Sequence, residues 1–232
     1  MNAVEVSIVD AVAIVRIDDG KANALSHAVI EQLHGALDLA DTQASAVCFI
    51  GRAGKLCAGF DLSVMTAGAD ATRNLVRAGG DLLMRIYGHP QPTVVACTGH
   101  ALAAGALFLL ACDTRIGVDG PSKIGLNETA IGMGLPAYAV ELARDRLSKR
   151  YFTSAALQAQ IFDPAAALEA GYLDQLVAAD QLEATAVAQA QQLGAYRRSA
   201  YSLTKQQSRG AMIQFVLSGL DADMANMVPP TV

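Results

Sequence analysis

The stretch that decides the fold runs from Thr93 to Gly134 and reads TVVACTGHALAAGALFLLACDTRIGVDGPSKIGLNETAIGMG. It opens with an apolar, β-branched run at residues 93–96, which predicts a buried strand. Small residues follow at 101–106, and then an apolar run at 107–111 predicts a helix. Small side chains at a strand-to-helix turn allow another backbone, or a ligand, to approach closely. The sequence therefore predicts a tight turn at which a helix points its free N–H groups at a ligand.

A single carboxylate, Glu128, stands 24 residues after Ala104 in the apolar frame IGLNETAI at 124–131. Two interpretations are open. Glu128 is either an exposed acid in the first turn of a helix that Asn127 caps, or a partly desolvated acid/base that faces the turn. In the second case, burial among apolar side chains would raise its pKa and suit it to proton transfer.

Bulk composition limits the class of protein. The chain has 232 residues, of which 53% are hydrophobic and 17% charged, with a net charge of −5. The length suits one large α/β domain, and the acidic balance argues against nucleic acid or an acidic membrane surface as partner. No run reaches the roughly 18–20 apolar residues of a membrane span, and we expect no signal peptide. Four cysteines in apolar contexts without a CxxC pair predict reduced core thiols and a cytoplasmic protein.

Strands and helices alternate along the chain. Strand–turn–helix units recur at 12–40, 47–87 and 94–111, which predicts stacked β-β-α units. Residues 65–71 are expected to form a mobile loop, and the tail at 227–232 to be irregular. The remaining expected elements are a hairpin (4–9 and 12–17), strands (46–50, 56–62, 113–118 and 173–177) and helices (26–40, 74–87, 136–147, 155–158, 164–170, 181–193 and 201–220).

Two turns of small residues, at 57–59 and 99–105, could each donate one backbone N–H to the same oxygen, as an oxyanion hole requires. Taken singly, each also fits a tight turn or close helix packing. Other chemistry is poorly supported. Residues 132–134 lack the third glycine of a dinucleotide-binding loop, and Ser63 and Ser122 lack a nucleophile elbow. The four histidines show no metal-ligand spacing, so we expect no metal site.

Taken together, these blocks resemble the crotonase superfamily, also called the enoyl-CoA hydratase/isomerase family. They occur in family order within about residues 4–177. The resemblance implies an α/β fold, a crotonase-like spiral of β-β-α turns with a helical C-terminal region. It implies a core with the active site at 1–177, a helical oligomerisation region at 178–232, and a homotrimer or dimer of trimers. The matching segments are KANAL (21–25), LCAGFDL (56–62), residues 101–113, IGLNET (124–129) and GMGLP (132–136).

By the same resemblance, the backbone N–H groups of Phe60 and Ala104 form an oxyanion hole and Glu128 is the catalytic acid/base. The substrate is carried as a coenzyme A thioester, so no separate cofactor is implied. Lys205 and Arg209 are candidates to hold the CoA phosphates, and residues 65–71 are expected to shape the acyl pocket. The implied CoA-binding residues are Ala22, Ala24, Ala58, Asp61, Leu62 and Ser63.

One departure from the family pattern is informative. Hydratases of the family carry two catalytic glutamates. This chain has Leu107 at the position of the first glutamate, and a leucine cannot transfer a proton. Hydration is best served by two carboxylates, whereas moving a double bond from C3 to C2 needs one base. The chain therefore most resembles the Δ3,Δ2-enoyl-CoA isomerases of fatty acid metabolism. A hydratase (lyase), another enolate-stabilising crotonase and a non-catalytic acyl-CoA-binding protein stay open as alternatives.

Overall fold

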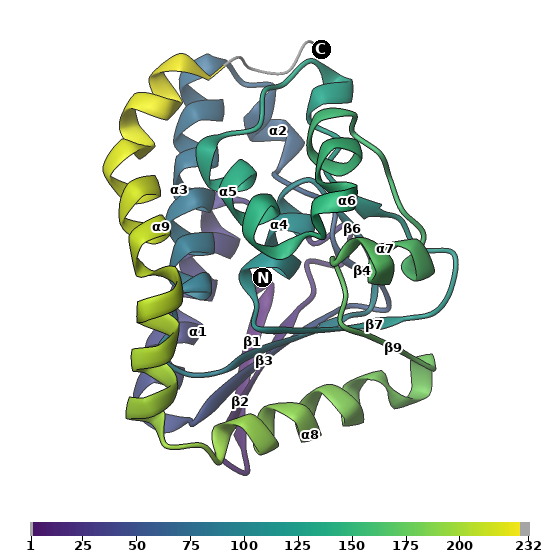
Figure 1. The fold of residues 1–232 in the computed structure, drawn as a ribbon, viewed down its shortest axis with the longest axis vertical. Helices are drawn as coiled ribbons and strands as arrows, with labels where there is room; N and C mark the ends of the chain where they lie inside the picture. The colour runs from purple at the N-terminus through teal and green to yellow at the C-terminus, as the bar shows by residue number, and fades with distance from the viewer. Residues whose placement is uncertain (1, 228–232) are drawn as a thin grey trace.

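The fold is built around a six-stranded sheet to which the chain returns repeatedly (Figure 1). The structure is a computed structural model and describes residues 2–227. The strand order is β1-β2-β3-β5-β7-β9, and every pair except the β1–β2 hairpin is parallel. The strands are β1 (Val4–Val9), β2 (Val12–Ile17), β3 (Ala46–Gly51), β5 (Thr93–Cys97), β7 (Thr114–Val118) and β9 (Gln175–Val177).

A second, three-stranded sheet explains how the turns of the spiral stack. It contains β4 (Gly54–Cys57), β6 (Gly99–Leu102) and β8 (Ile124–Gly125), all parallel. Each turn gives one strand to each sheet, because β3 continues into β4, β5 into β6 and β7 into β8. A helical segment follows each turn. The predicted spiral of β-β-α units is therefore confirmed.

Local signals mark the ends of some helices. The Ser26 side chain accepts from the N–H of Val29 at the start of α1, and Asp163 caps α7 in the same way. Gly171, at φ 94°, ends α7 in the left-handed conformation. The helical elements are α1 (His27–Gln43), α2 (Leu62–Met65), α3 (Ala69–Tyr87), α4 (Ala104–Ala111), η1 (Thr129–Ile131), α5 (Ala137–Arg146), α6 (Lys149–Phe152), η2 (Thr153–Leu157), α7 (Pro164–Ala170), η3 (Ala179–Gln181), α8 (Leu182–Gly194) and α9 (Arg198–Asn226).

Apolar side chains cover the large sheet on both faces. The main core fills the space between one face and helices α1, α3, α4 and α5, whereas α8 alone packs on the other face (Figure 1). This double coverage explains why β3 has an unbroken apolar sequence rather than an alternating one. All four cysteines are free and buried, as predicted. Within residues 2–227 no helix has the length and apolarity needed to cross a membrane.

The expectation of a mobile loop at residues 65–71 is wrong. Met65 ends α2, and α3 begins at Ala69, five residues before the predicted start of that helix. Thr72 fixes the short connection, since its hydroxyl donates to the carbonyls of Met65 and Gly68 at 2.8 and 3.0 Å. The first turn and a half of α3 is mostly polar. The apolar periodicity of the helix therefore starts several residues after Ala69, and the predicted start was placed too late. The part of the expected irregular tail at 228–232 lies outside the described residues.

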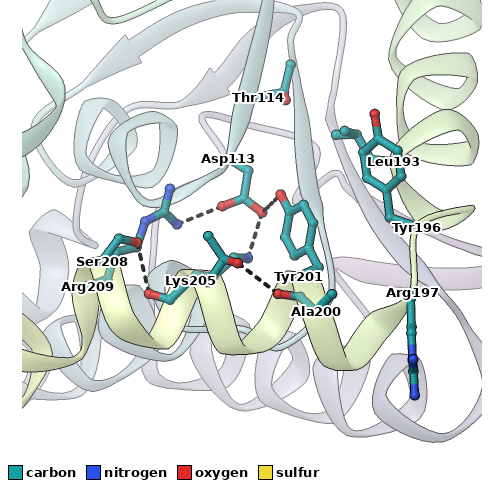
Figure 2. A pocket seen from close by; sticks show the side chains of 11 residues that line it. Asp113, Thr114, Leu193, Tyr196, Arg197, Ala200, Tyr201, Lys205, Ser208 and Arg209 are labelled. Carbon is teal, nitrogen blue, oxygen red and sulfur yellow. Dashed lines mark hydrogen bonds and ion pairs between the residues drawn. The ribbon is translucent and has the colours of Figure 1, made fainter.

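A buried carboxylate ties α9 to the edge of the sheet. Asp113, which directly precedes β7, accepts from Lys205 at 2.6 Å, Arg209 at 2.7 Å and Tyr201 at 2.9 Å. Figure 2 shows these three side chains converging on it from α9. The backbone N–H of Thr93 donates to the same carboxylate at 2.9 Å. The cluster thus joins the starts of two parallel strands to the C-terminal helix.

Burial alone would raise the pKa of Asp113, but Lys205 and Arg209 hold that pKa below its usual value. The carboxylate therefore stays ionised, and its four donors occupy most of the positions at which it can accept a hydrogen bond. This network also corrects an expectation. Lys205 and Arg209 are committed to Asp113, and neither is among the residues lining the groove where CoA binding is predicted, described below.

Replacing Asp113 by asparagine should be strongly destabilising, because it leaves the cations of Lys205 and Arg209 buried without a counter-charge. We expect the free energy of unfolding to fall by roughly 3–5 kcal/mol, measured by urea titration at neutral pH. Asp70→Asn is the control, since the Asp70 side chain is 94% exposed in its ion pair with Arg73. Equal stability of the two variants would show that the cluster does not hold α9 in place.

Candidate active site

Three turns of the spiral meet around a cavity of about 370 Å³. The β4–α2 connection, the β6–α4 turn and the segment after β8 each contribute part of the wall. The cavity is mostly apolar, and among the described residues that line it Glu128 is the only carboxylic acid. The lining residues are Ala58, Gly59, Phe60, Leu62, Met65, Thr66, Leu102, Ala103, Leu107, Asn127, Glu128, Ile131, Met133, Pro136 and Tyr138.

The first turn leaves the N–H of Phe60 free. The N–H of Leu25 donates to the carbonyl of Gly59, and the N–H of Asp61 donates to the carbonyl of Leu25, at 2.9 and 3.1 Å. In such a parallel bridge the residue between the two bonded groups points its own N–H to the opposite side. Within residues 2–227 the Phe60 N–H has no acceptor. Gly59 makes this path possible, because its φ of 111° is a conformation that side chains disfavour.

The second turn leaves the N–H of Ala104 free. Ala104 is the first residue of α4, and a first-turn N–H has no acceptor inside its own helix. No other acceptor for it is found in the described part of the chain. The preceding residue, Ala103, has φ 52° and ψ −123°, a sparsely populated conformation for a residue with a Cβ. Such strain, which typically costs about 1–3 kcal/mol, is characteristic of functional turns.

Glycines hold the two turns against each other. A Cβ at Gly105 would lie 2.1 Å from the carbonyl oxygen of Cys57, and one at Gly99 would lie 2.0 Å from the carbonyl of Gly54. A Cβ at Gly59 would lie 3.9 Å from the N atom of Ala104. The two free N–H groups therefore belong to backbone segments in close contact, which is the arrangement predicted for an oxyanion hole.

Strand β8 carries Glu128 to the same place. Leu102 of β6 pairs with Gly125 of β8, and the N–H of Ala103 donates to the Gly125 carbonyl at 3.0 Å. The chain then enters η1, where Glu128 is the residue before the first turn. Its carbonyl accepts from the N–H of Met133 at 3.0 Å, which fixes the backbone of this segment.

The Glu128 side chain is buried, and one of its two carboxylate oxygens has no hydrogen bond. The residue is 6% exposed, and its Oε2 atom has no hydrogen bond. Burial raises the pKa of Glu128 to about 7, with the nearby N–H groups of Glu128 and Asn127 offsetting part of that shift. Leu107, which also lines the cavity, is 1% exposed. The exposed helix-start interpretation of Glu128 is therefore wrong.

The cavity wall contains one acid/base that titrates near neutrality and Phe60, whose N–H is free, and the free N–H of Ala104 directly follows Ala103 of the wall. Such a set can remove a proton next to a carbonyl while the donors stabilise charge on the carbonyl oxygen. No group of three or more His, Cys, Asp or Glu side chains suited to a metal ion occurs among residues 2–227.

A second cavity, of about 530 Å³, adjoins the first and shares Ala58, Phe60 and Leu62 with it. Its lining includes all six residues predicted to bind CoA. They are Ala22, Ala24, Ala58, Asp61, Leu62 and Ser63. The structure thus brings these residues together in one groove that leads to Glu128.

The wall of this groove is rigid at the loop after β2. The Asp19 carboxylate accepts from the N–H groups of Lys21 and Asn23 at 2.7 and 2.9 Å. The buried amide of Asn23 donates to the carbonyls of Ile17 and Leu56 at 2.7 and 3.2 Å. Lys21 is the only Lys or Arg among the described residues that line the groove.

The sequence predicted some of the cavity wall and missed one part of it. Met65 and Thr66 belong to the segment at 65–71 that was expected to shape the acyl pocket, and both line this cavity. Met133, Pro136 and Tyr138, which come from the segment after η1 and the start of α5, were not predicted to line it. Periodicity could not have placed these side chains, because they converge from separate turns of the spiral.

Comparisons with known proteins identify the family of this chain. The profile of the enoyl-CoA hydratase/isomerase family matches residues 7–228. Human mitochondrial enoyl-CoA delta isomerase 1 is 31% identical over 222 residues, which cover 94% of this chain and 74% of the human protein. A probable enoyl-CoA hydratase of Bacillus subtilis is 32% identical over 162 residues, which cover 68% of this chain and 61% of that protein.

Solved structures give the same result. An enoyl-CoA hydratase/isomerase family protein from Pseudomonas syringae superposes with a TM-score of 0.95 at 41% identity, covering 97% of this chain and 98% of its own. Human mitochondrial delta3-delta2-enoyl-CoA isomerase superposes with a TM-score of 0.92 at 30% identity, covering 97% of this chain and 90% of its own. The crotonase-like fold predicted from the sequence is confirmed.

Gly105→Ala should separate the two turns, since the new Cβ would meet the carbonyl of Cys57, which cannot move freely. We expect a loss of unfolding free energy of roughly 1–3 kcal/mol or more, measured by chemical denaturation. Gly219→Ala in α9 is the matched control, because a Cβ there meets nothing within 4 Å. A Gly105→Ala protein as stable as this control would contradict the close approach.

Glu128→Gln should change stability in a pH-dependent way. The carboxyl has a pKa raised from 4.5 to about 7 in the folded protein, so its contribution to stability is complete below about pH 4.5 and is lost as pH rises through 7. The neutral amide of glutamine has no charge to desolvate, so the variant does not lose this stability as the pH rises. At pH 8 we expect the variant to be more stable than the parent by roughly 3 kcal/mol, with little difference at pH 4.

Urea titrations at both pH values measure this difference, with Glu31→Gln, on an exposed position of α1, as control. A stability gap that stays constant from pH 4 to pH 8 would mean that the Glu128 carboxyl is not desolvated.

Proposed function

We propose that this chain, which belongs to the enoyl-CoA hydratase/isomerase family, shifts the double bond of an enoyl-CoA from C3 to C2. Glu128 acts as the only proton carrier. The backbone N–H groups of Phe60 and Ala104 hold the thioester oxygen, and the CoA portion lies along the groove that adjoins the cavity.

The proposed reaction has two proton transfers. The ionised Glu128 takes a proton from C2, which the thioester carbonyl makes acidic, and the electron pair spreads over C2, C3, C4 and the thioester oxygen. The N–H groups of Phe60 and Ala104 stabilise the negative charge on that oxygen. The protonated Glu128 then gives the proton back at C4, which leaves the double bond between C2 and C3 and restores the carboxylate.

The observation that carries this proposal is the buried carboxylate of Glu128, whose Oε2 atom has no hydrogen bond and which lies in the same mostly apolar cavity wall as Phe60. A base whose pKa lies near the working pH both accepts and releases a proton readily, as a shuttle must. Leu107 offers no second carboxylate that could activate a water. The chain's similarity to proteins named enoyl-CoA delta isomerase supports the same reaction.

The remaining expectations stay predictions from the sequence. They are a cytoplasmic location, a role in fatty acid metabolism, a reaction without a separate cofactor, and a homotrimer or dimer of trimers with 178–232 as its oligomerisation region.

A test compares 3-enoyl-CoA and 2-enoyl-CoA esters as substrates of the parent protein and of Glu128→Gln. We expect the parent to convert 3-enoyl-CoA to the conjugated 2-enoyl ester, followed by the rise in enoyl-thioester absorbance. Its kcat/KM should increase with pH and level off above about 7, because the base must be ionised. Glu128→Gln should lower kcat by at least about 10²–10⁴-fold, while the Kd of a saturated acyl-CoA changes little.

Glu31→Gln serves as the control, since this exposed glutamate lines neither cavity. Full isomerase activity of Glu128→Gln would remove the proposed base. Loss of 2-enoyl absorbance by hydration, with no action on 3-enoyl esters, would identify a hydratase instead. Binding of every ester without turnover would identify an acyl-CoA-binding protein.

A further inference from the structure

Two rings of the cavity wall rest on a pair of adjacent glycines. Phe60 and Tyr138 line the cavity, and behind them runs α3, which contributes no residue to the lining. A Cβ at Gly79 would lie 2.3 and 2.4 Å from the Cε1 and Cζ atoms of the Phe60 ring. A Cβ at Gly80 would lie 2.8 Å from the Tyr138 ring. The rings therefore occupy the space that a side chain at position 79 or 80 would fill.

Glycine in the middle of a helix is unfavourable by about 0.5–1 kcal/mol relative to alanine, so two in succession call for a packing reason. Both positions are buried. Gly35 and Gly219 are also helical glycines, but a Cβ at either of them meets nothing within 4 Å. The close ring contact is thus particular to the segment of α3 behind the cavity.

The two rings differ in their freedom to move. Tyr138 is fully buried, and its hydroxyl donates to the Val76 carbonyl of α3 at 3.2 Å. Phe60 is only partly buried, and no such bond holds its ring. The atoms that a Cβ at Gly79 would meet are at the outer end of the Phe60 side chain. An added methyl group can therefore be accommodated by rotation of that ring away from α3, and the cavity lies on that side.

The Phe60 backbone, in contrast, is fixed by hydrogen bonds on both sides. Leu25 donates to the carbonyl of Gly59 and accepts from the N–H of Asp61. A displaced ring would consequently narrow the cavity and leave the Phe60 N–H where it is.

We propose that Gly79 is a specificity-determining residue: by admitting the Phe60 ring against α3, it sets the width of the acyl cavity and so the length of acyl chain that the protein accepts. The inference rests on the proposed function, because it takes the 370 Å³ cavity to hold the acyl chain. Gly80 likewise makes room for the Tyr138 ring, but that ring is held by its hydrogen bond to Val76 and is less free to rotate.

The test compares 3-hexenoyl-CoA with 3-decenoyl-CoA as substrates of Gly79→Ala. We expect the ratio of kcat/KM for the long ester over the short ester to fall by at least about tenfold, since a hydrophobic pocket discriminates a single methylene by roughly 10–200-fold. The loss should appear mainly in the long ester, because a longer chain needs more of the cavity that the displaced ring would narrow. The double variant Gly79→Ala with Phe60→Leu should bring the ratio back toward that of the parent.

Gly35→Ala is the matched control and should leave the ratio unchanged. An unchanged ratio in folded Gly79→Ala, or an equal loss for both esters, would overturn the inference. If Gly79→Ala does not fold, Phe60→Leu alone provides the test. It should raise the ratio, and a ratio at or below that of the parent would count against the proposal.

The outcome is separable from the proposed function. If the parent isomerises neither ester, the proposed function fails, and calorimetric binding of hexanoyl-CoA and decanoyl-CoA then tests the inference by itself. A Gly79→Ala protein that loses affinity for decanoyl-CoA alone supports it, and one that binds both as the parent does overturns it.

Discussion

The contact between the Cys57 carbonyl and Gly105 is the constraint on which the site depends. Two successive turns of the spiral approach so closely that no side chain fits between them, and Gly99 against Gly54 repeats the same kind of contact at the start of the same two strands, β4 and β6. Because the backbones touch, the turns that end β4 and β6 lie side by side. Each turn then passes through a residue with positive φ, Gly59 or Ala103, and each is followed by an N–H without an acceptor in the described part of the chain.

Two buried carboxylates show how surroundings decide the role of an acid. Asp113 accepts from four donors, and its cationic neighbours keep its pKa low, so it is a fixed anion that joins α9 to the sheet. Glu128 is just as buried, but its Oε2 has no donor and burial raises its pKa to about 7. The first arrangement stabilises the fold, whereas the second costs stability and keeps a proton exchangeable.

Helix α3 links the cavity to the rest of the core. On one side its glycines admit Phe60 and Tyr138, and on another it packs along α9, whose Leu220 lies near Gly80 (Figure 1). The Asp113 cluster holds α9 in turn. The width of the cavity therefore depends on packing that extends well beyond the residues that line it.

Local periodicity and caps in the sequence predicted the strands of the large sheet, most of the long helices and the lone carboxylate, but not strands β6 and β8 of the small sheet. The spiral class, Phe60, Ala104 and the six groove residues were predicted through resemblance to a family. The tertiary structure was needed to show that Glu128 is buried with its Oε2 atom unbonded, that Lys205 pairs with Asp113, and that α3 begins at Ala69. These outcomes depend on which side chains meet across separate turns of the spiral, and such contacts leave no signal in the spacing of residues along the chain.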